Sequence, residues 1–182
     1  MSNVVYIATS LDGFIADRDG GLDWLHSVPN PQGDDLGFAA FLAGIDALLM
    51  GRNTYQSILD FNLDLPSQWP YPKPVYVVGS SPITIPDALE GKVFALAPAE
   101  PAEMMATLAQ MGHHHLYLDG GNTIQRFLAQ GLVDELIITQ IPVVLGGGVP
   151  LFGALPTMQS YELVSSEVML GAMVKSHYRR IR

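Results

Sequence analysis

The chain contains no cysteine, so disulfide bonds, thiolate nucleophiles and cysteine-ligated zinc or iron–sulfur centres are excluded. Basic residues are scarce: 9 Lys and Arg stand against 18 Asp and Glu, a formal net charge of −9. Such an acidic chain is poorly suited to broad contact with nucleic-acid phosphates or anionic lipid, so neither nucleic acid nor a membrane is an expected partner. A small anionic ligand is still compatible with this charge, because a pocket needs only a few local cations and backbone N–H groups.

Long apolar runs are also missing, since no stretch reaches the roughly 18 residues of a membrane span. Met1 leads into Val4–Ala8 without a basic segment, and we therefore expect a soluble, cytoplasmic protein. Hydrophobic residues nevertheless make up 48% of the 182 residues, which is enough for a packed core. This length favours one domain over residues 1–182 rather than two smaller ones.

Short apolar runs alternate with segments of helical spacing. Strands are predicted at Val4–Ala8, Ala47–Met50, Val75–Val78, Val93–Leu96, Leu116–Leu118 and Leu136–Val144, and near Leu163 and Val174 in a hairpin around Gly171. Helices are predicted from Asp34 or Asp35 to Gly44, after Gly51, over Pro101–Met111 and around Ile124, with a loop over Pro66–Pro74. The pattern predicts an α/β fold: one mixed, mostly parallel sheet of about eight strands, flanked by about four helices and ending in an antiparallel hairpin.

Two glycine-containing turns join predicted strands to predicted helices. Gly51–Thr54 places a cation and a hydroxyl at a helix start, where free N–H groups and the helix dipole favour a phosphate. Gly120 and Gly121 let the backbone approach a ligand closely at a second helix start. Because ligands bind beyond the carboxyl ends of strands in open α/β sheets, both turns are candidate sites, with simple helix capping as the structural alternative. Neither GxGxxG nor GxxxxGK[ST] occurs, which excludes ordinary Rossmann and P-loop sites.

Several motifs together resemble a known superfamily. Leu49–Tyr55, Val77–Ser81 and Asp119–Asn122 occur in the order seen in dihydrofolate reductases, and the resemblance covers nearly the whole chain. Ser10–Ala16, and Gly131–Leu136 followed by three consecutive glycines, look closer to a sister branch, the RibD C-terminal reductase domain of bacterial riboflavin biosynthesis. This resemblance implies a dihydrofolate reductase-like fold and NADPH-dependent hydride transfer to a pterin-like or aminopyrimidine-like substrate, as in 5-amino-6-(5-phosphoribosylamino)uracil reductase.

The resemblance also implies a set of NADPH contacts. The set comprises Ala8, Ile15, Gly51, Arg52, Asn53, Thr54, Ser80, Ser81, Gly120, Gly121, Asn122 and Thr123. By family analogy, Arg52 and Thr54 lie at the phosphates, Ser80 and Ser81 near the adenosine 2′-phosphate, and the last four residues of the set under the pyrophosphate. Ala8 and Ile15 match positions that flank the nicotinamide, and core packing is the alternative for both.

For catalysis, the resemblance singles out Asp35, Asp12 and Thr139. Asp35 stands 16 residues before Gly51, the family spacing of a proton-carrying carboxylate. A carboxyl group in an apolar pocket can relay a proton at neutral pH, whereas helix capping is the alternative role. Thr139 resembles a strand threonine that helps such a carboxylate hold the substrate, and Asp12 occupies the place of a polar group in the riboflavin branch, with an Asp-Gly turn as the alternative.

Two tryptophans and one aliphatic residue complete the predictions. Trp24 and Ile58 are assigned to substrate binding, Trp24 by analogy with an early family tryptophan, and Trp69 to packing. No metal site is expected, because His113–His115 are consecutive residues that cannot converge on one ion in regular structure. A homodimer is expected from family analogy alone.

Departures from the family patterns leave the substrate open. No arginine stands near Pro72–Pro74, where the folate branch has its glutamate clamp, and Phe14 replaces the basic residue usual in the riboflavin branch. Two further hypotheses therefore stay open. One is a reductase of another small carbonyl or nitro compound on the same scaffold, and the other is a non-catalytic module that binds NADPH or a flavin precursor.

Overall fold

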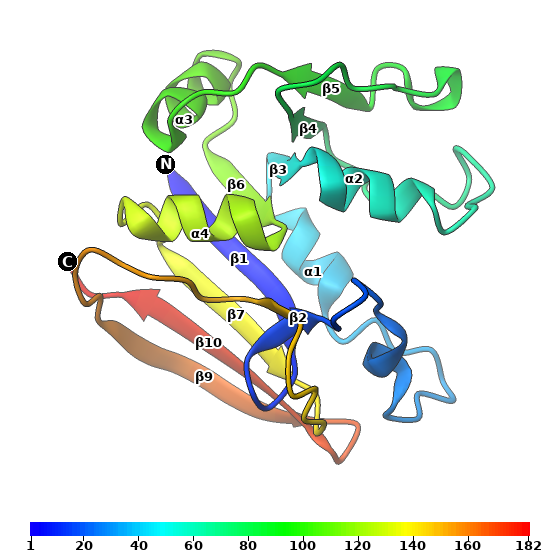
Figure 1. The fold of residues 1–182 in the computed structure, drawn as a ribbon, viewed down its shortest axis with the longest axis vertical. Helices are drawn as coiled ribbons and strands as arrows, with labels where there is room; N and C mark the ends of the chain where they lie inside the picture. The colour runs from blue at the N-terminus through cyan, green and yellow to red at the C-terminus, as the bar shows by residue number, and fades with distance from the viewer.

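The computed structural model describes all 182 residues and contains one eight-stranded mixed sheet. Its strands are β1 Ser2–Thr9, β3 Ala47–Gly51, β4 Val75–Val78, β5 Val93–Leu96, β6 His115–Asp119, β7 Glu135–Gln140, β9 Tyr161–Met169 and β10 Met173–Arg180. They are ordered β5-β4-β3-β6-β1-β7-β10-β9 (Figure 1). The first six pair in parallel, and β10 runs antiparallel to both of its neighbours. The predicted mixed sheet with a C-terminal hairpin is thus confirmed.

Four α-helices accompany the sheet: α1 Phe38–Ala43, α2 Arg52–Leu59, α3 Pro101–Gln110 and α4 Gly121–Ala129. Two short 3-10 helices, η1 Asp23–His26 and η2 Asp87–Leu89, lie in the connections. The helix predicted to follow Asp34 or Asp35 starts later than expected, at Phe38, because Leu36 (φ 57°) and Gly37 (φ 86°) adopt left-handed backbone that cannot continue a right-handed helix. No helix is long and apolar enough to cross a bilayer.

Apolar side chains pack on both faces of the sheet. A first cluster of 14 buried residues includes Leu108 of α3 and Phe127 of α4. A second cluster of 13 lies on the opposite face and includes Leu42 of α1 and Tyr55 of α2. This double coverage explains why β3 reads as a continuous apolar run, since a parallel strand buried on both faces needs no polar alternation. A third cluster of 3 buried residues lies under the segment that precedes α1.

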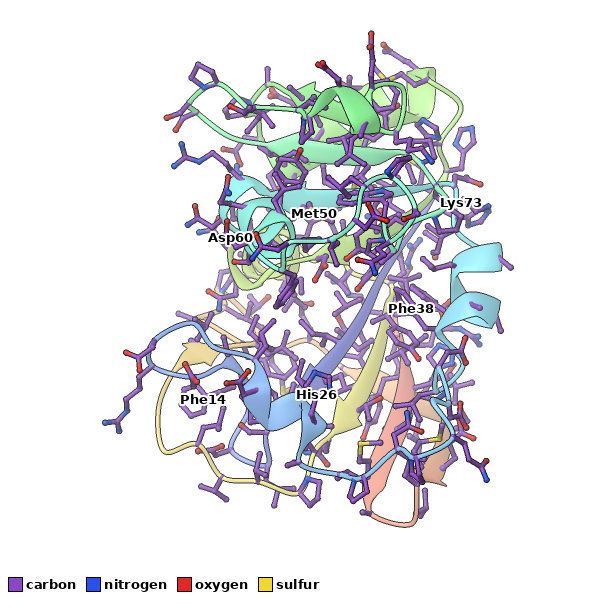
Figure 2. All side chains as sticks on the ribbon, turned by 90° about the vertical axis from the view of Figure 1, so that its right-hand side faces the viewer. Phe14, His26, Phe38, Met50, Asp60 and Lys73 are labelled. Carbon is purple, nitrogen blue, oxygen red and sulfur yellow. The ribbon has the colours of Figure 1, made fainter.

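Parallel pairing sets the carboxyl ends of neighbouring strands level at one edge of the sheet. Gly51 of β3 pairs with Val78 of β4, and Met50 pairs with Asp119 of β6. In Figure 2, Met50 of β3 lies close to Asp60, which follows α2, and Phe14 lies in the lower part of the view. The turns that follow these strands therefore meet, which is the arrangement that α/β sheets use for ligands.

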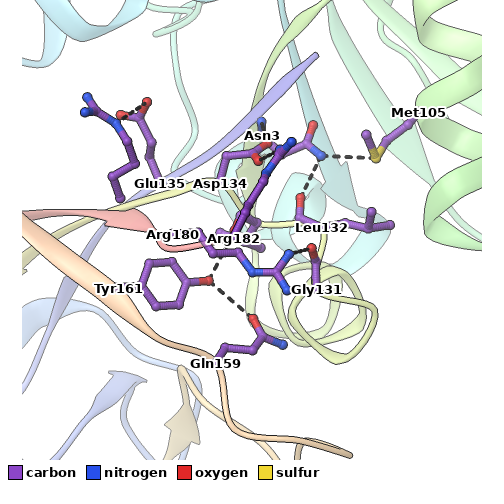
Figure 3. A network of polar contacts seen from close by, with 12 residues as sticks. Asn3, Met105, Gly131, Leu132, Asp134, Glu135, Gln159, Tyr161, Arg180 and Arg182 are labelled. Atoms are coloured by element: carbon purple, nitrogen blue, oxygen red, sulfur yellow. Dashed lines mark hydrogen bonds and ion pairs between the residues drawn. The ribbon is translucent and has the colours of Figure 1, made fainter.

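A polar network at the opposite end of the sheet holds the chain termini in place (Figure 3). The fully buried Asn3 donates its side-chain amide to the Leu132 carbonyl at 2.7 Å, and its backbone N–H donates to the Asp134 carboxylate at 2.9 Å. Arg182 pairs with the same carboxylate at 2.6 Å, and Arg180 donates to the Gly131 carbonyl. These contacts fix β1, β7 and β10 relative to one another, far from the carboxyl edge.

A second, two-stranded sheet was not predicted. It pairs β2 Phe14–Ala16 with β8 Val149–Pro150. The prediction of a strand continuing to Val144 was also wrong: β7 ends at Gln140, shortly before Pro142, which has no N–H to donate. The chain then passes through three glycines and comes so close to β2 that a Cβ on Gly148 would lie 2.1 Å from the Ala16 carbonyl oxygen.

We predict that Gly148→Ala destabilises the protein much more than Gly146→Ala. Both glycines have positive φ, 143° and 69°, but a Cβ on Gly146 would meet nothing within 4 Å. We expect losses in the free energy of unfolding of about 3 kcal/mol for Gly148→Ala and about 1 kcal/mol for Gly146→Ala, measured by urea denaturation. Equal losses would show that the close approach to β2 is not a constraint.

Candidate functional site

The turns that follow β3, β4, β5 and β6 line one cavity of about 250 Å³ at the carboxyl edge. Four predicted cofactor residues line it: Gly51, Ser80, Asn122 and Thr123. Its walls are completed by Val78, Gly79, Pro98, Met104, Arg126 and Phe127. The cavity thus combines apolar walls with a polar rim, a combination suited to a heterocyclic ring with polar substituents.

Contact between two of these turns depends on a missing side chain. Gly120 has φ 88°, and a Cβ there would lie 2.2 Å from the Thr54 hydroxyl oxygen. A Cβ on Gly121 would lie 3.1 Å from the Ile15 Cδ1 atom, which brings β2 to the start of α4. The structure therefore places four predicted cofactor residues, from three separate segments, against one another.

Arg52 lies between this cavity and a second one of about 370 Å³. A Cβ on Gly79 would lie 3.2 Å from the Arg52 Cβ atom, so the arginine stem packs against the turn after β4. Arg52 and Asn53 line the second cavity together with Tyr55, Gln56, Pro82, Ile83 and Thr84. Ser81 is exposed and directly precedes Pro82, at the rim of this second cavity.

The start of α4 offers unmatched hydrogen-bond donors. The first backbone N–H groups of a helix have no partner within the helix, and the α4 dipole adds partial positive charge there. The Thr123 side chain is 7% exposed and its hydroxyl makes no hydrogen bond within the chain. Together with the Arg52 guanidinium, these donors fit a phosphorylated nucleotide, because phosphate oxygens accept such bonds.

Ala8, Thr139 and Trp24 come together further along the edge. Ala8 on β1 pairs directly with Thr139 on β7, so their side chains lie on the same face. Ala8 and Trp24 both pack against the third apolar cluster, formed by Val28, Ile141 and Met173. Trp24 donates its indole N–H to the Gly21 carbonyl at 3.2 Å.

Asp35 does not lie in an apolar pocket as the resemblance implied. Its carboxylate is exposed and accepts the backbone N–H groups of Gly37 and Ala39, each at 2.9 Å. These two bonds, that of Ala39 first, lower the pKa of Asp35 below its ordinary value. The arrangement is the helix-capping alternative, because Ala39 belongs to the first turn of α1.

Asp12 also serves a structural role in this arrangement. Its carboxylate is exposed and accepts bonds from the Ser10 hydroxyl at 2.6 Å and from the Gly146 N–H at 2.7 Å. A bond from the Leu145 N–H at 3.1 Å adds to these. The Ser10 bond contributes most to lowering the pKa of Asp12. Asp12 thereby ties the turn after β1 to the loop that follows β7.

Ile58 and Trp69 belong to the second apolar cluster. Trp69 is 8% exposed and meets Tyr55 and Tyr71 edge to face, so the packing role predicted for Trp69 is confirmed. Ile58 is half-buried on α2 and packs against the same cluster. Among the consecutive histidines, His113 hydrogen-bonds the Tyr76 hydroxyl at 2.9 Å while His115 begins β6.

Asp119, at the end of the central strand β6, was not predicted as a site residue. Burial raises its pKa to about 6, although the Gly120 N–H donates to its carboxylate at 2.8 Å. Burial, and secondarily the Asp119 charge, raise the pKa values of Tyr71 and Tyr117. Its half-buried carboxyl group can therefore exchange a proton near neutral pH at the level of the glycine turns. The sequence signal was a carboxylate directly before Gly120-Gly121.

The chain belongs to the RibD C-terminal domain family, whose profile matches residues 4–174. It is 34% identical over 178 residues to YwjB, an uncharacterised Bacillus subtilis protein, with 97% of each chain covered. A solved structure from Shewanella sp. PV-4, provisionally assigned to riboflavin biosynthesis, is 48% identical and covers 100% of both chains with a TM-score of 0.93. Enterococcus faecalis dihydrofolate reductase, solved with NADP(H), shares the fold: TM-score 0.67, 18% identity, coverage 100% of this chain and 97% of that one.

We predict that Asp119→Asn stabilises the protein at high pH. A native pKa of about 6 lies above the unfolded value of about 3.9, so ionisation opposes folding and the wild type loses stability as the pH rises through 6. We expect the variant to gain about 1–2 kcal/mol at pH 8 and nothing at pH 4, measured by urea denaturation. Asp19→Asn, at an exposed loop carboxylate, is the matched control. An equal effect of Asp119→Asn at both pH values would show that ionisation of Asp119 does not oppose folding.

Proposed function

We propose that this protein is an NADPH-dependent reductase of a small heterocyclic substrate. The observation that carries the proposal is the close contact of two turns, in which a Cβ on Gly120 would lie 2.2 Å from the Thr54 hydroxyl oxygen. This contact lets two helix starts face one cavity that is rimmed by Ser80 and Asn122. Membership of the RibD C-terminal domain family supports the same class of reaction.

The residues around the glycine turns would hold the cofactor. Arg52, with Ser80 and Ser81, would bind the 2′-phosphate, while the N–H groups at the start of α4 would bind the pyrophosphate. Ala8 and Ile15 would form the apolar wall against the nicotinamide. When bound, NADPH would supply the hydride.

Asp119 is the group best suited to manage the proton in this reductase. Its pKa of about 6 lets both protonation states exist near neutral pH. Asp35 and Asp12 have lowered pKa values and use their oxygens for backbone bonds, so they serve the proposed reaction by fixing the segments around the site. Thr139 orients the substrate, and Trp24 covers it next to Ala8.

The proposed substrate is an aminopyrimidine-like or pterin-like heterocycle of the type reduced in riboflavin biosynthesis. Phe14 supports a substrate that differs from the usual one of that branch, because an apolar ring stands in place of a cation. Reduction of another small carbonyl or nitro compound is the alternative that this departure favours. A non-catalytic NADPH-binding module can be distinguished from both kinds of reductase, because it would bind NADPH without oxidising it.

The cofactor proposal is tested by titrating the protein with NADPH and NADH, followed by tryptophan fluorescence. We expect micromolar, NADPH-selective binding. Arg52→Ala should weaken NADPH about 10- to 100-fold and NADH less than about 3-fold, because only NADPH carries the 2′-phosphate. Lys92→Ala removes a cation at the start of β5 and should change neither affinity. If Arg52→Ala weakens NADPH and NADH binding equally, Arg52 does not recognise the 2′-phosphate. If the wild type binds neither nucleotide, the reductase proposal is wrong.

The catalytic proposal is tested by NADPH oxidation across pterins, aminopyrimidines, flavin precursors and small carbonyl or nitro compounds. With any active substrate, Asp119→Asn should lower kcat by about 100-fold or more while NADPH affinity stays within about 3-fold, because a proton donor acts in the chemical step. Asp35→Asn is the matched comparison and should lower kcat much less. Tight NADPH binding without oxidation of any compound would favour the binding module.

A further inference from the structure

Four residues form a row across four neighbouring strands, level with the carboxyl ends of β1 and β7. Ala8 on β1 pairs with Thr139 on β7, Thr139 pairs with Lys175 on β10, and Lys175 pairs with Glu167 on β9. Residues directly opposite on neighbouring strands have Cβ atoms about 5 Å apart and lie on one face. Lys175 therefore stands beside Thr139 and only one strand further from Ala8.

The Lys175 ammonium is held between two acceptors. It donates to the Leu36 carbonyl at 2.9 Å and pairs with the Glu167 carboxylate at 2.9 Å. The Lys175 side chain is 16% exposed, whereas that of Glu167 is 57% exposed and faces solvent. An ammonium has three N–H donors, so the third is open to a ligand, and the Glu167 carboxylate is the partner most easily displaced.

Thr139 adds a second donor at the same place. The residue is 7% exposed, and its hydroxyl makes no hydrogen bond within the chain. The carboxylate expected to share it, Asp35, is occupied by the Gly37 and Ala39 N–H groups. The row therefore offers two hydrogen-bond donors, the Thr139 O–H and the Lys175 N–H, where a carboxylate acceptor was expected. A ligand that matches these donors must bring a hydrogen-bond acceptor.

Five arginines of the chain have their contacts elsewhere. Arg52 and Arg126 line the cavities at the glycine turns, and Arg18 donates to the Gly146 carbonyl in the loop after β7. Arg180 and Arg182 lie in the polar network at the opposite end of the sheet (Figure 3). In a chain of net charge −9, this half-enclosed ammonium lies beside a free hydroxyl and interacts with the carboxylates of Glu167 and Asp35, so displacing Glu167 leaves a positive charge that attracts an anion.

We propose that Thr139 and Lys175 together bind an anionic oxygen group, a carboxylate or phosphate, which displaces the Glu167 carboxylate from the ammonium. The ligand oxygen accepts one bond from the Thr139 hydroxyl and one from the Lys175 ammonium. The assignment of this group to the substrate of the reductase rests on the proposed function, whereas anion binding by the pair does not. A substrate held in this way turns a hydrogen-bond acceptor toward β7. A protein carboxylate at this place would instead bind an amino group of the substrate.

The test is a titration with benzoate, benzamidine and inorganic phosphate, followed by the backbone amide NMR signals of Thr139 and Lys175. Benzoate and benzamidine match in size and differ in charge. We expect benzoate, phosphate or both to shift these signals and benzamidine to leave them unchanged, with the stronger anion identifying the source. The dissociation constant of that anion should rise about 10-fold or more in Lys175→Met, change less than about 3-fold in Lys175→Arg, and fall about 2-fold in Glu167→Gln.

The control Lys92→Met removes a distant positive charge and should leave anion affinity unchanged. Unchanged affinity in Lys175→Met overturns the proposal, as does tighter binding of benzamidine than of either anion. If Lys175→Met fails to fold, Glu167→Gln tests the proposal instead. An anion affinity of Glu167→Gln that is no higher than that of the wild type would show that the anion does not displace the Glu167 carboxylate, and this overturns the proposal. Loss of NADPH binding with Lys175-dependent anion binding intact would remove the reductase proposal alone, and the converse result would remove only the anion site.

Discussion

The contact between Gly120 and Thr54 is the constraint on which the candidate site depends. The turns after β6 and β3 belong to neighbouring strands, whose separation of about 4.8 Å is set by the backbone ladder and cannot widen to admit a side chain. A Cβ on Gly120 would lie 2.2 Å from the Thr54 oxygen, far inside any allowed contact. Because glycine stands there, the starts of α2 and α4 converge, and backbone donors from both reach the same edge of the sheet.

Much of the fold could be predicted because the parallel strands carry their own signal. Runs such as Ala47–Met50 and Val75–Val78 are β-branched or apolar throughout, and the structure buries them on both faces. The missed pair β2 and β8 has no such signal, since these strands are 3 and 2 residues long and exist because Gly148 can approach Ala16. The late start of α1 was equally hidden, because Leu36 has left-handed backbone and its carbonyl accepts bonds from Tyr6 and Lys175, which are distant in the sequence.

The parts of the candidate site that depend on the order of motifs along the chain could be predicted. The parts that depend on burial in the folded structure could not. The glycine turns could be located because each comes directly after an apolar strand. The raised pKa of Asp119 could not, since it depends on burial in the folded chain, where Tyr71 of the proline-rich loop comes near enough to feel the Asp119 charge. Asp35 and Lys175 show the same limit: family spacing drew attention to the first, while strand pairing across the sheet places the second beside Thr139.

The third apolar cluster has a consequence for how a ligand can enter. Only 3 buried residues, Val28, Ile141 and Met173, make up this cluster, against 14 and 13 in the two main clusters. Detaching the segment before α1 exposes little apolar surface and leaves both main clusters intact. The free energy of this local opening is therefore a small fraction of that of global unfolding. The sheet can stay folded through many cycles of ligand exchange while only the segment before α1 opens and closes.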